Sequence, residues 1–130
     1  MYMLYFIYGK VKVMKVVEEL RGREYSLSEI VEYYYKVMEN TVAIEIDNKI
    51  EASLVYGIQI DKILIEKDGT QSTESEKIDI ISCNLELVKE ICRIMHKNLV
   101  DPIHLVDVLE DNISKVFRLD SKIKFVENVV

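Results

Sequence analysis

The chain has 130 residues and a formal net charge of -6, with 17 Lys and Arg against 23 Asp and Glu. This length favours a single domain that is large enough to build a hydrophobic core without disulfides or metals. The hydrophobic content of 49% is typical of a globular protein rather than a disordered one. The acidic balance argues against binding to nucleic acids or to anionic membrane surfaces, because both need clustered Lys and Arg.

The first 13 residues are treated as an extension that precedes the domain. They begin with the apolar run Met1–Tyr8, which is too short to span a bilayer and lacks the basic region of a signal peptide. This run is interpreted as an edge strand or a tail. Alternatively, translation begins at Met14 and the run is not part of the protein. We expect one domain over residues 14–117 and a tail over 118–130.

Strand patterns dominate the first two-thirds of the chain. Alternating hydrophobicity with β-branched and aromatic residues predicts strands over residues 32–38, 41–46, 49–60, 62–66 and 78–81. Turns are expected at Asp47-Asn48 and at Asp68-Gly69, the second within a polar loop over 67–77. Residues 15–21 fit both helical and strand spacing, and we favour a strand. Gly57 lies inside a strand pattern and indicates a bulge or a close backbone approach.

The last third of the chain predicts two helices. Asn84 is suited to cap a helix over residues 85–98, and Asp101 with Pro102 is suited to open a second helix. The apolar stripe of the second helix comprises Leu105, Val106, Leu109, Ile113, Val116 and Phe117. Only a few residues separate the helices, so we expect them to form an antiparallel hairpin. The alternating segment 122–126 is expected to add an edge strand.

These elements predict an α+β fold. We expect an antiparallel sheet of about four to six strands, arranged as a meander of hairpins, followed by the C-terminal two-helix hairpin packed on one face.

The start of the second helix carries the clearest candidate for chemistry. His104, Asp107 and Asp111 share one helix face, and Glu110 lies beside them. A histidine with two carboxylates can bind a divalent metal or perform acid–base chemistry. This face lies opposite the apolar stripe, and carboxylates early in a helix also offset its dipole. We therefore favour a solvated surface, with a metal site or a contact surface for a partner as alternatives.

Cys92 and His96 raise the possibility of a structural zinc. They lie four residues apart on a helix, a spacing that lets two side chains meet one ion, with Cys83 or His104 available as further ligands. No Cys-x2-Cys pair accompanies them, and Cys92 falls within the apolar stripe, where a free cysteine behaves as a small hydrophobe. We favour core packing for both residues. Two cysteines in a chain of this size also favour reduced thiols and a cytoplasmic location.

Other motifs give little support for catalysis. No serine lies in a Gly-x-Ser-x-Gly context, and neither a glycine-rich phosphate loop nor a Walker motif is present. No cofactor is therefore expected, and an enzymatic role is not indicated. Tyr33, Tyr34 and Tyr35 are residues of the kind that stack on nucleic-acid bases, but no basic groove accompanies them, so sheet packing is favoured.

The apolar stripe of the first helix is broader than a surface helix requires. It covers about half of the helix circumference, with Leu87, Ile91 and Ile94 on one side and Leu85 on the other. It either faces the sheet and the second helix at once or provides a homodimer interface. We expect a small interaction or regulatory module without enzymatic activity, associating with itself through Leu87, Ile91 and Ile94 or with an unidentified protein.

Three short segments occur in a characteristic order: Tyr56–Ile58 (YGI), Asp79–Ser82 (DIIS) and Pro102–Asp111 (PIHLVDVLED). Together they resemble a small family of uncharacterised Firmicutes proteins, classed as a domain of unknown function, that typically end in a segment similar to PIHLxDVxED. The resemblance extends from Met14 to about Ile113. It implies a bacterial, cytoplasmic, stand-alone domain and brings no activity, cofactor or catalytic residue.

Overall fold

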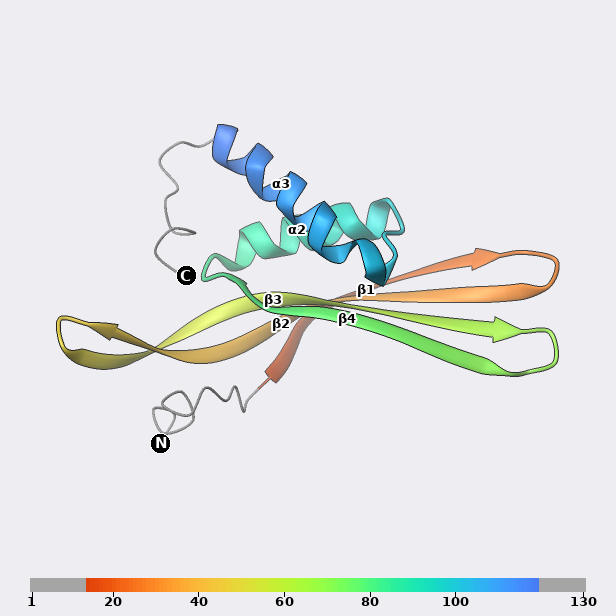
Figure 1. Ribbon diagram of the computed structural model, residues 1–130, viewed down its shortest axis with the longest axis horizontal. Helices are drawn as coiled ribbons and strands as arrows, with labels where there is room; N and C mark the ends of the chain where they lie inside the picture. Colours follow the sequence, from red (N-terminus) through yellow and green to blue (C-terminus); the bar gives the residue numbers. More distant parts are fainter. Residues whose placement is uncertain (1–13, 120–130) are drawn as a thin grey trace.

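The computed structural model describes residues 14–119, which form a four-stranded antiparallel sheet with two helices packed on one face (Figure 1). The strands lie side by side in chain order and are β1 (Met14–Tyr25), β2 (Glu29–Ile46), β3 (Lys49–Glu66) and β4 (Gln71–Ser82). The helix α2 (Leu85–Lys97), the 3-10 turn η1 (Pro102–His104) and the helix α3 (Leu105–Leu119) follow. The expected α+β fold is confirmed. The extension over 1–13 and the strand expected at 122–126 lie outside the described residues.

The hairpin between β2 and β3 is the longest ladder of the sheet. The strands expected over 32–38 and 41–46 are one continuous strand, β2, which pairs with β3 from Glu29 opposite Glu66 to Ile46 opposite Lys49. Asp47 and Asn48 form the predicted turn with φ values of 52° and 63°. Positive φ at both central residues is what a two-residue turn needs to match the twist of the strands.

The prediction of a polar loop over residues 67–77 is wrong for most of that segment. β4 begins at Gln71 and pairs with β3 without a register shift from Ile65 opposite Gln71 to Ile58 opposite Ile78. Residues 71–77 are all exposed. Figure 1 shows that this end of the sheet extends past the helices. Both faces of the strand therefore meet water, and the hydrophobic alternation that would have revealed it is absent.

The core lies between the sheet and the helical layer. In β2, Tyr33, Tyr35 and Val37 are buried, and their partners Ile60 and Ile58 in β3 face the same side. The helices complete the core with buried side chains at Val88, Ile91, Cys92, Met95, Leu105 and Leu109. Residues 15–21 are part of β1, as favoured from the sequence.

The predicted first helix is confirmed, whereas the second begins differently. The Asn84 side chain caps α2 by accepting a hydrogen bond from the Leu87 N–H at 3.2 Å. Asp101 makes no side-chain capping bond, because its carboxylate accepts a hydrogen bond from Lys62 Nζ at 2.9 Å instead. Pro102 opens the 3-10 turn η1, and α3 then runs back across α2 (Figure 1).

Candidate functional site

The acidic surface predicted on the second helix is exposed throughout. His104, Asp107, Glu110 and Asp111 all face solvent. His104 belongs to η1 and not to α3, so the change of helix type breaks the regular spacing that placed it with the two aspartates. Within residues 14–119, no group of three or more His, Cys, Asp or Glu side chains is arranged to hold a metal ion. The geometry fits a solvated face rather than a metal site.

Cys92 and His96 pack into the fold and do not converge on a shared site. Burial raises the pKa of the Cys92 thiol to about 12, so it is not an activated nucleophile. His96 points towards β1, where Nε2 lies 2.8 Å from the Arg21 carbonyl oxygen and donates a hydrogen bond to it. Its ring meets Tyr35 edge-on, with centroids 5.7 Å apart. Cys83 is exposed and free, so both cysteines are thiols.

The wide apolar stripe of α2 is explained largely by packing. Ile91 is only 1% exposed and belongs to the core rather than to an interface. Leu87 and Ile94 are half-buried on the same flank. The opposite flank is held against β1 by the histidine contact and by an ion pair of 3.3 Å between Arg93 and Glu18. Leu87 and Ile94 are therefore turned away from β1, towards the side on which α3 packs against β4.

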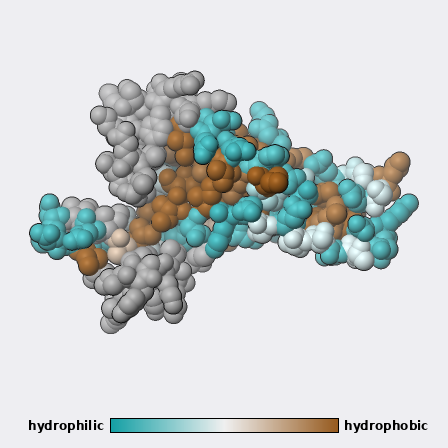
Figure 2. Space-filling model, viewed as in Figure 1, coloured by the Kyte–Doolittle hydropathy of each residue, from teal (hydrophilic) through white to brown (hydrophobic). Residues whose placement is uncertain are grey.

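Two exposed apolar side chains lie where η1 leads into α3. Ile103 is 75% exposed and Val106 is 52% exposed. Val106 was expected in the buried stripe, but α3 turns Leu105 and Leu109 to the core and leaves Val106 at the edge of that face. Ile80 in β4 is also exposed. Figure 2 shows hydrophobic surface gathered across the middle of the molecule, where α3 and η1 meet the sheet.

A groove of about 410 Å³ lies beside this apolar surface. Its walls are Glu74, Ser75 and Glu76 of β4 and Pro102 with Ile103 of η1. Sequence reasoning missed the groove because it assigned these β4 residues to a loop. The signal that was available is the pair of carboxylates at i and i+2, which share a face only if the segment is a strand.

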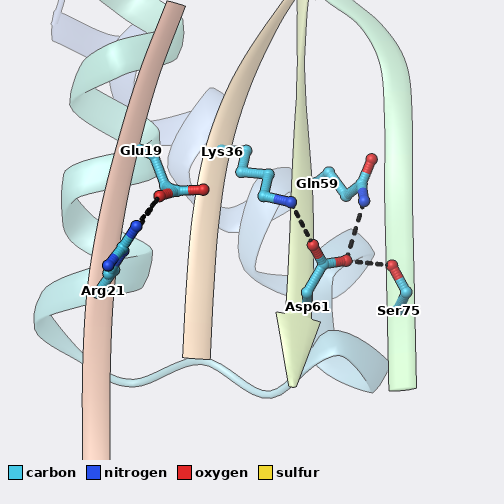
Figure 3. A network of polar contacts seen from close by, with 6 residues as sticks. All are labelled: Glu19, Arg21, Lys36, Gln59, Asp61 and Ser75. Carbon is cyan, nitrogen blue, oxygen red and sulfur yellow. Dashed lines mark hydrogen bonds and ion pairs between the residues drawn. The ribbon is translucent and has the colours of Figure 1, made fainter. Parts of the chain in front are cut away.

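The opposite face of the sheet carries a satisfied polar network (Figure 3). Asp61 accepts hydrogen bonds from Lys36 Nζ at 2.7 Å, from Gln59 Nε2 at 2.9 Å and from the Ser75 hydroxyl. Desolvation alone would raise the pKa of Asp61, but these donors outweigh it and hold the pKa below its usual value. The network joins β2, β3 and β4, and both carboxylate oxygens of Asp61 already accept hydrogen bonds within it.

The comparisons with known proteins agree with the coarser part of the resemblance, a family of unknown function. Residues 11–115 match the model of a family of unknown function, DUF6514. No curated protein and no solved structure matches the chain. None of the helices described is both long enough and apolar enough to cross a membrane. The match covers most of the chain, including the whole of the sheet, α2 and about the first three turns of α3, and the chain therefore belongs to the family of unknown function DUF6514.

Proposed function

We propose that this protein is a small interaction module without enzymatic activity, and that it binds a partner protein through the surface formed by η1, the start of α3 and β4. The single observation that carries this proposal is the exposure of Ile103 and Val106 beside the groove along β4. Exposed apolar side chains that gather next to a groove mark interaction sites more often than isolated ones do.

The state of the reactive side chains supports a role in binding. The Cys92 thiol is buried with a raised pKa, and His96 uses Nε2 to hold β1. The Asp61 carboxylate already accepts hydrogen bonds from three side chains. Each group therefore has a structural use. The resemblance of the segment 102–111 to proteins ending in PIHLxDVxED supports a cytoplasmic role in a Firmicutes bacterium.

The test compares surface variants after purification of the untagged protein from its own host, without chelator. Native mass spectrometry should show a second protein in stoichiometric amount on the wild type. The Ile103→Glu/Val106→Glu variant should lose it, because a carboxylate cannot be buried in an apolar contact without a large desolvation cost. Leu27→Glu is the comparison at a second exposed apolar site, since Leu27 is 96% exposed and lines a separate groove of about 370 Å³ at the turn between β1 and β2.

Three results would contradict the proposal. The first is a wild-type chain that carries no second protein. The second is an equal loss of the partner in Leu27→Glu. The third is a bound metal ion or small molecule in the wild-type spectrum, which would point to a ligand-binding or catalytic function. Thermal unfolding of each variant checks that the fold is retained.

A further inference from the structure

The outer edge of β4 is an open sheet edge. Among the described strands β4 pairs with β3 alone, and the ladder over residues 71–78 has neither a proline nor a register shift. Alternate N–H and C=O groups of an edge strand point away from the sheet and are available to a further strand. An extended peptide can add to such an edge through main-chain hydrogen bonds.

The edge strand on the other side of the sheet, β1, is less open. Its ladder with β2 shifts register between Val16 and Glu18, and the ladder of β4 shifts register beyond Ile78, so a bulge does not distinguish the two edges. The contact with α2 does distinguish them. The helix holds β1 through His96 on the Arg21 carbonyl oxygen and Arg93 on Glu18. The structure therefore offers β4 as the edge for an added strand.

The groove gives this edge a wall on the helical side. Ile103 is exposed and Pro102 lies next to it, facing Glu74 and Glu76 across the groove. Side chains of an added strand alternate between the two faces of the sheet. Every second side chain of such a strand would therefore lie on the groove side, near Ile103.

The groove carries two carboxylates, and their negative charge favours an occupant with basic side chains. Glu74 pairs with Lys62 in the ladder and Glu76 with Ile60, so both carboxylates lie on the face that carries the helices. Lys62 is already bound to Asp101 at 2.9 Å. Neither glutamate forms an ion pair with another residue of the described chain. A second copy of β4 at this edge would place carboxylates near carboxylates, which is unfavourable.

We propose that the β4 edge takes up an extended segment of a partner protein as a fifth strand, and that basic side chains of this segment lie against Glu74 and Glu76. This inference rests on the proposed function and names the class of partner: an extended chain with basic residues at every second position. The main chain supplies the hydrogen bonds, and the two glutamates set the charge that is accepted.

The probe is a fluorescently labelled eight-residue peptide that alternates lysine with valine, titrated with the full chain and followed by anisotropy. The wild type should bind it saturably, with weaker binding at higher salt because the ion pairs are exposed. Glu74→Lys/Glu76→Lys should weaken binding about tenfold or more, since it replaces two cross-strand attractions by repulsions. Glu86→Lys/Glu90→Lys makes the same change of charge on the exposed face of α2 and should leave the affinity within about twofold.

A second peptide that alternates lysine with proline separates strand addition from simple charge attraction. It has the same charge, but proline removes half of the main-chain donors and fixes φ away from strand values, so it should bind far more weakly. Equal binding of the two peptides, or equal loss in the two double variants, would overturn the proposal. So would a dimer of the wild type that disappears in Glu74→Lys/Glu76→Lys, because the occupant would then be a second copy.

Binding of the natural partner to the two double variants shows whether strand addition fails while the proposed function holds. Loss of the partner in both Ile103→Glu/Val106→Glu and Glu74→Lys/Glu76→Lys supports both. Loss in the first variant alone leaves the interaction surface standing and overturns strand addition at β4.

Discussion

At the scale of single residues, Gly57 is the position that tolerates no side chain. It lies where the ladder between β3 and β4 shifts register, and a Cβ atom there would be 2.0 Å from the Ile78 carbonyl oxygen. That oxygen is part of the backbone and cannot move aside without disrupting β4. We expect Gly57→Ala to lower the free energy of unfolding by about 3 kcal/mol or more.

Urea unfolding of Gly57→Ala and Gly22→Ala tests this expectation. In Gly22→Ala the new Cβ would lie 2.5 Å from Leu99 Cδ2, the end of a flexible side chain that can rotate away. The loss for Gly22→Ala should therefore be clearly smaller. Equal losses in the two variants would contradict the role assigned to the bulge at Gly57.

The two cysteines should differ strongly in reactivity. Cys92 is fully buried and burial raises its thiol pKa to about 12, whereas Cys83 is exposed. The thiolate is the reactive form, so a disulfide reagent should titrate one thiol per chain in the native state and two after denaturation. The Cys83→Ser variant should show no rapid reaction. Fast reaction of that variant would mean that α2 opens readily.

At the scale of elements, the sequence predicted those whose pattern is local. Alternation, the Asp47-Asn48 turn and the Asn84 cap each depend on neighbouring residues, and all are confirmed. The outer half of β4 was missed because it extends beyond the helices, so no buried face marks it. The burial of Val106 was predicted wrongly, since the 3-10 turn η1 decides where α3 begins and depends on the tertiary contact of Asp101 with Lys62.

The candidate sites divide in the same way, into those that a local sequence pattern predicts and those that depend on tertiary contacts. Exposure of the four acidic-surface residues agrees with the solvated face favoured from the helix pattern. The groove along β4 joins residues 74–76 to residues 102–103. Such a site depends on contacts between segments far apart in the chain, and local sequence patterns carry no signal for them.

Self-association through α2 stays a prediction at this scale. Leu87 and Ile94 remain half-buried, whereas Ile91 is covered. If a second copy completes the burial of this flank, the wild type should be a dimer by light scattering coupled to size exclusion. Leu87→Glu and Ile94→Glu should then shift it to a monomer with the fold retained. A wild type that is monomeric at high micromolar concentration would contradict this interface.

At the scale of the whole molecule, the two faces of the sheet differ in what covers them. One face is buried beneath the helices, where Tyr35 Oη donates to the Val100 carbonyl oxygen at 3.0 Å and ties the loop after α2 to β2. The other face carries the polar network, which crosses three strands (Figure 3), together with the buried side chains of Met38 and Val55. The edge of β4 belongs to neither face, and it is there that we propose a partner binds.

The polar network should make the stability of the molecule depend on pH in the acid range. The pKa of Asp61 is lower in the folded protein than its ordinary value, which is about 3.9 in an unfolded chain. Its carboxylate therefore stabilises the fold above that pH, and the contribution is lost as the pH falls through the lowered pKa. Asp61→Asn should reduce the free energy of unfolding at pH 7 by about 1.5 to 3 kcal/mol, the range for hydrogen bonds to a charged group.

Urea unfolding of wild type and Asp61→Asn at a series of pH values measures this contribution. The difference in the free energy of unfolding should be full at neutral pH and should shrink as the pH falls below about 4, since the wild-type carboxyl is then protonated as well. Glu51→Gln is the control, because Glu51 is exposed in β3 near the turn and has no ion-pair partner among the described residues. Its effect should be small at every pH. A difference for Asp61→Asn that stays constant down to acid pH would mean that the network stabilises the sheet through shape and neutral hydrogen bonds. The charge of Asp61 would then contribute nothing to joining β2, β3 and β4.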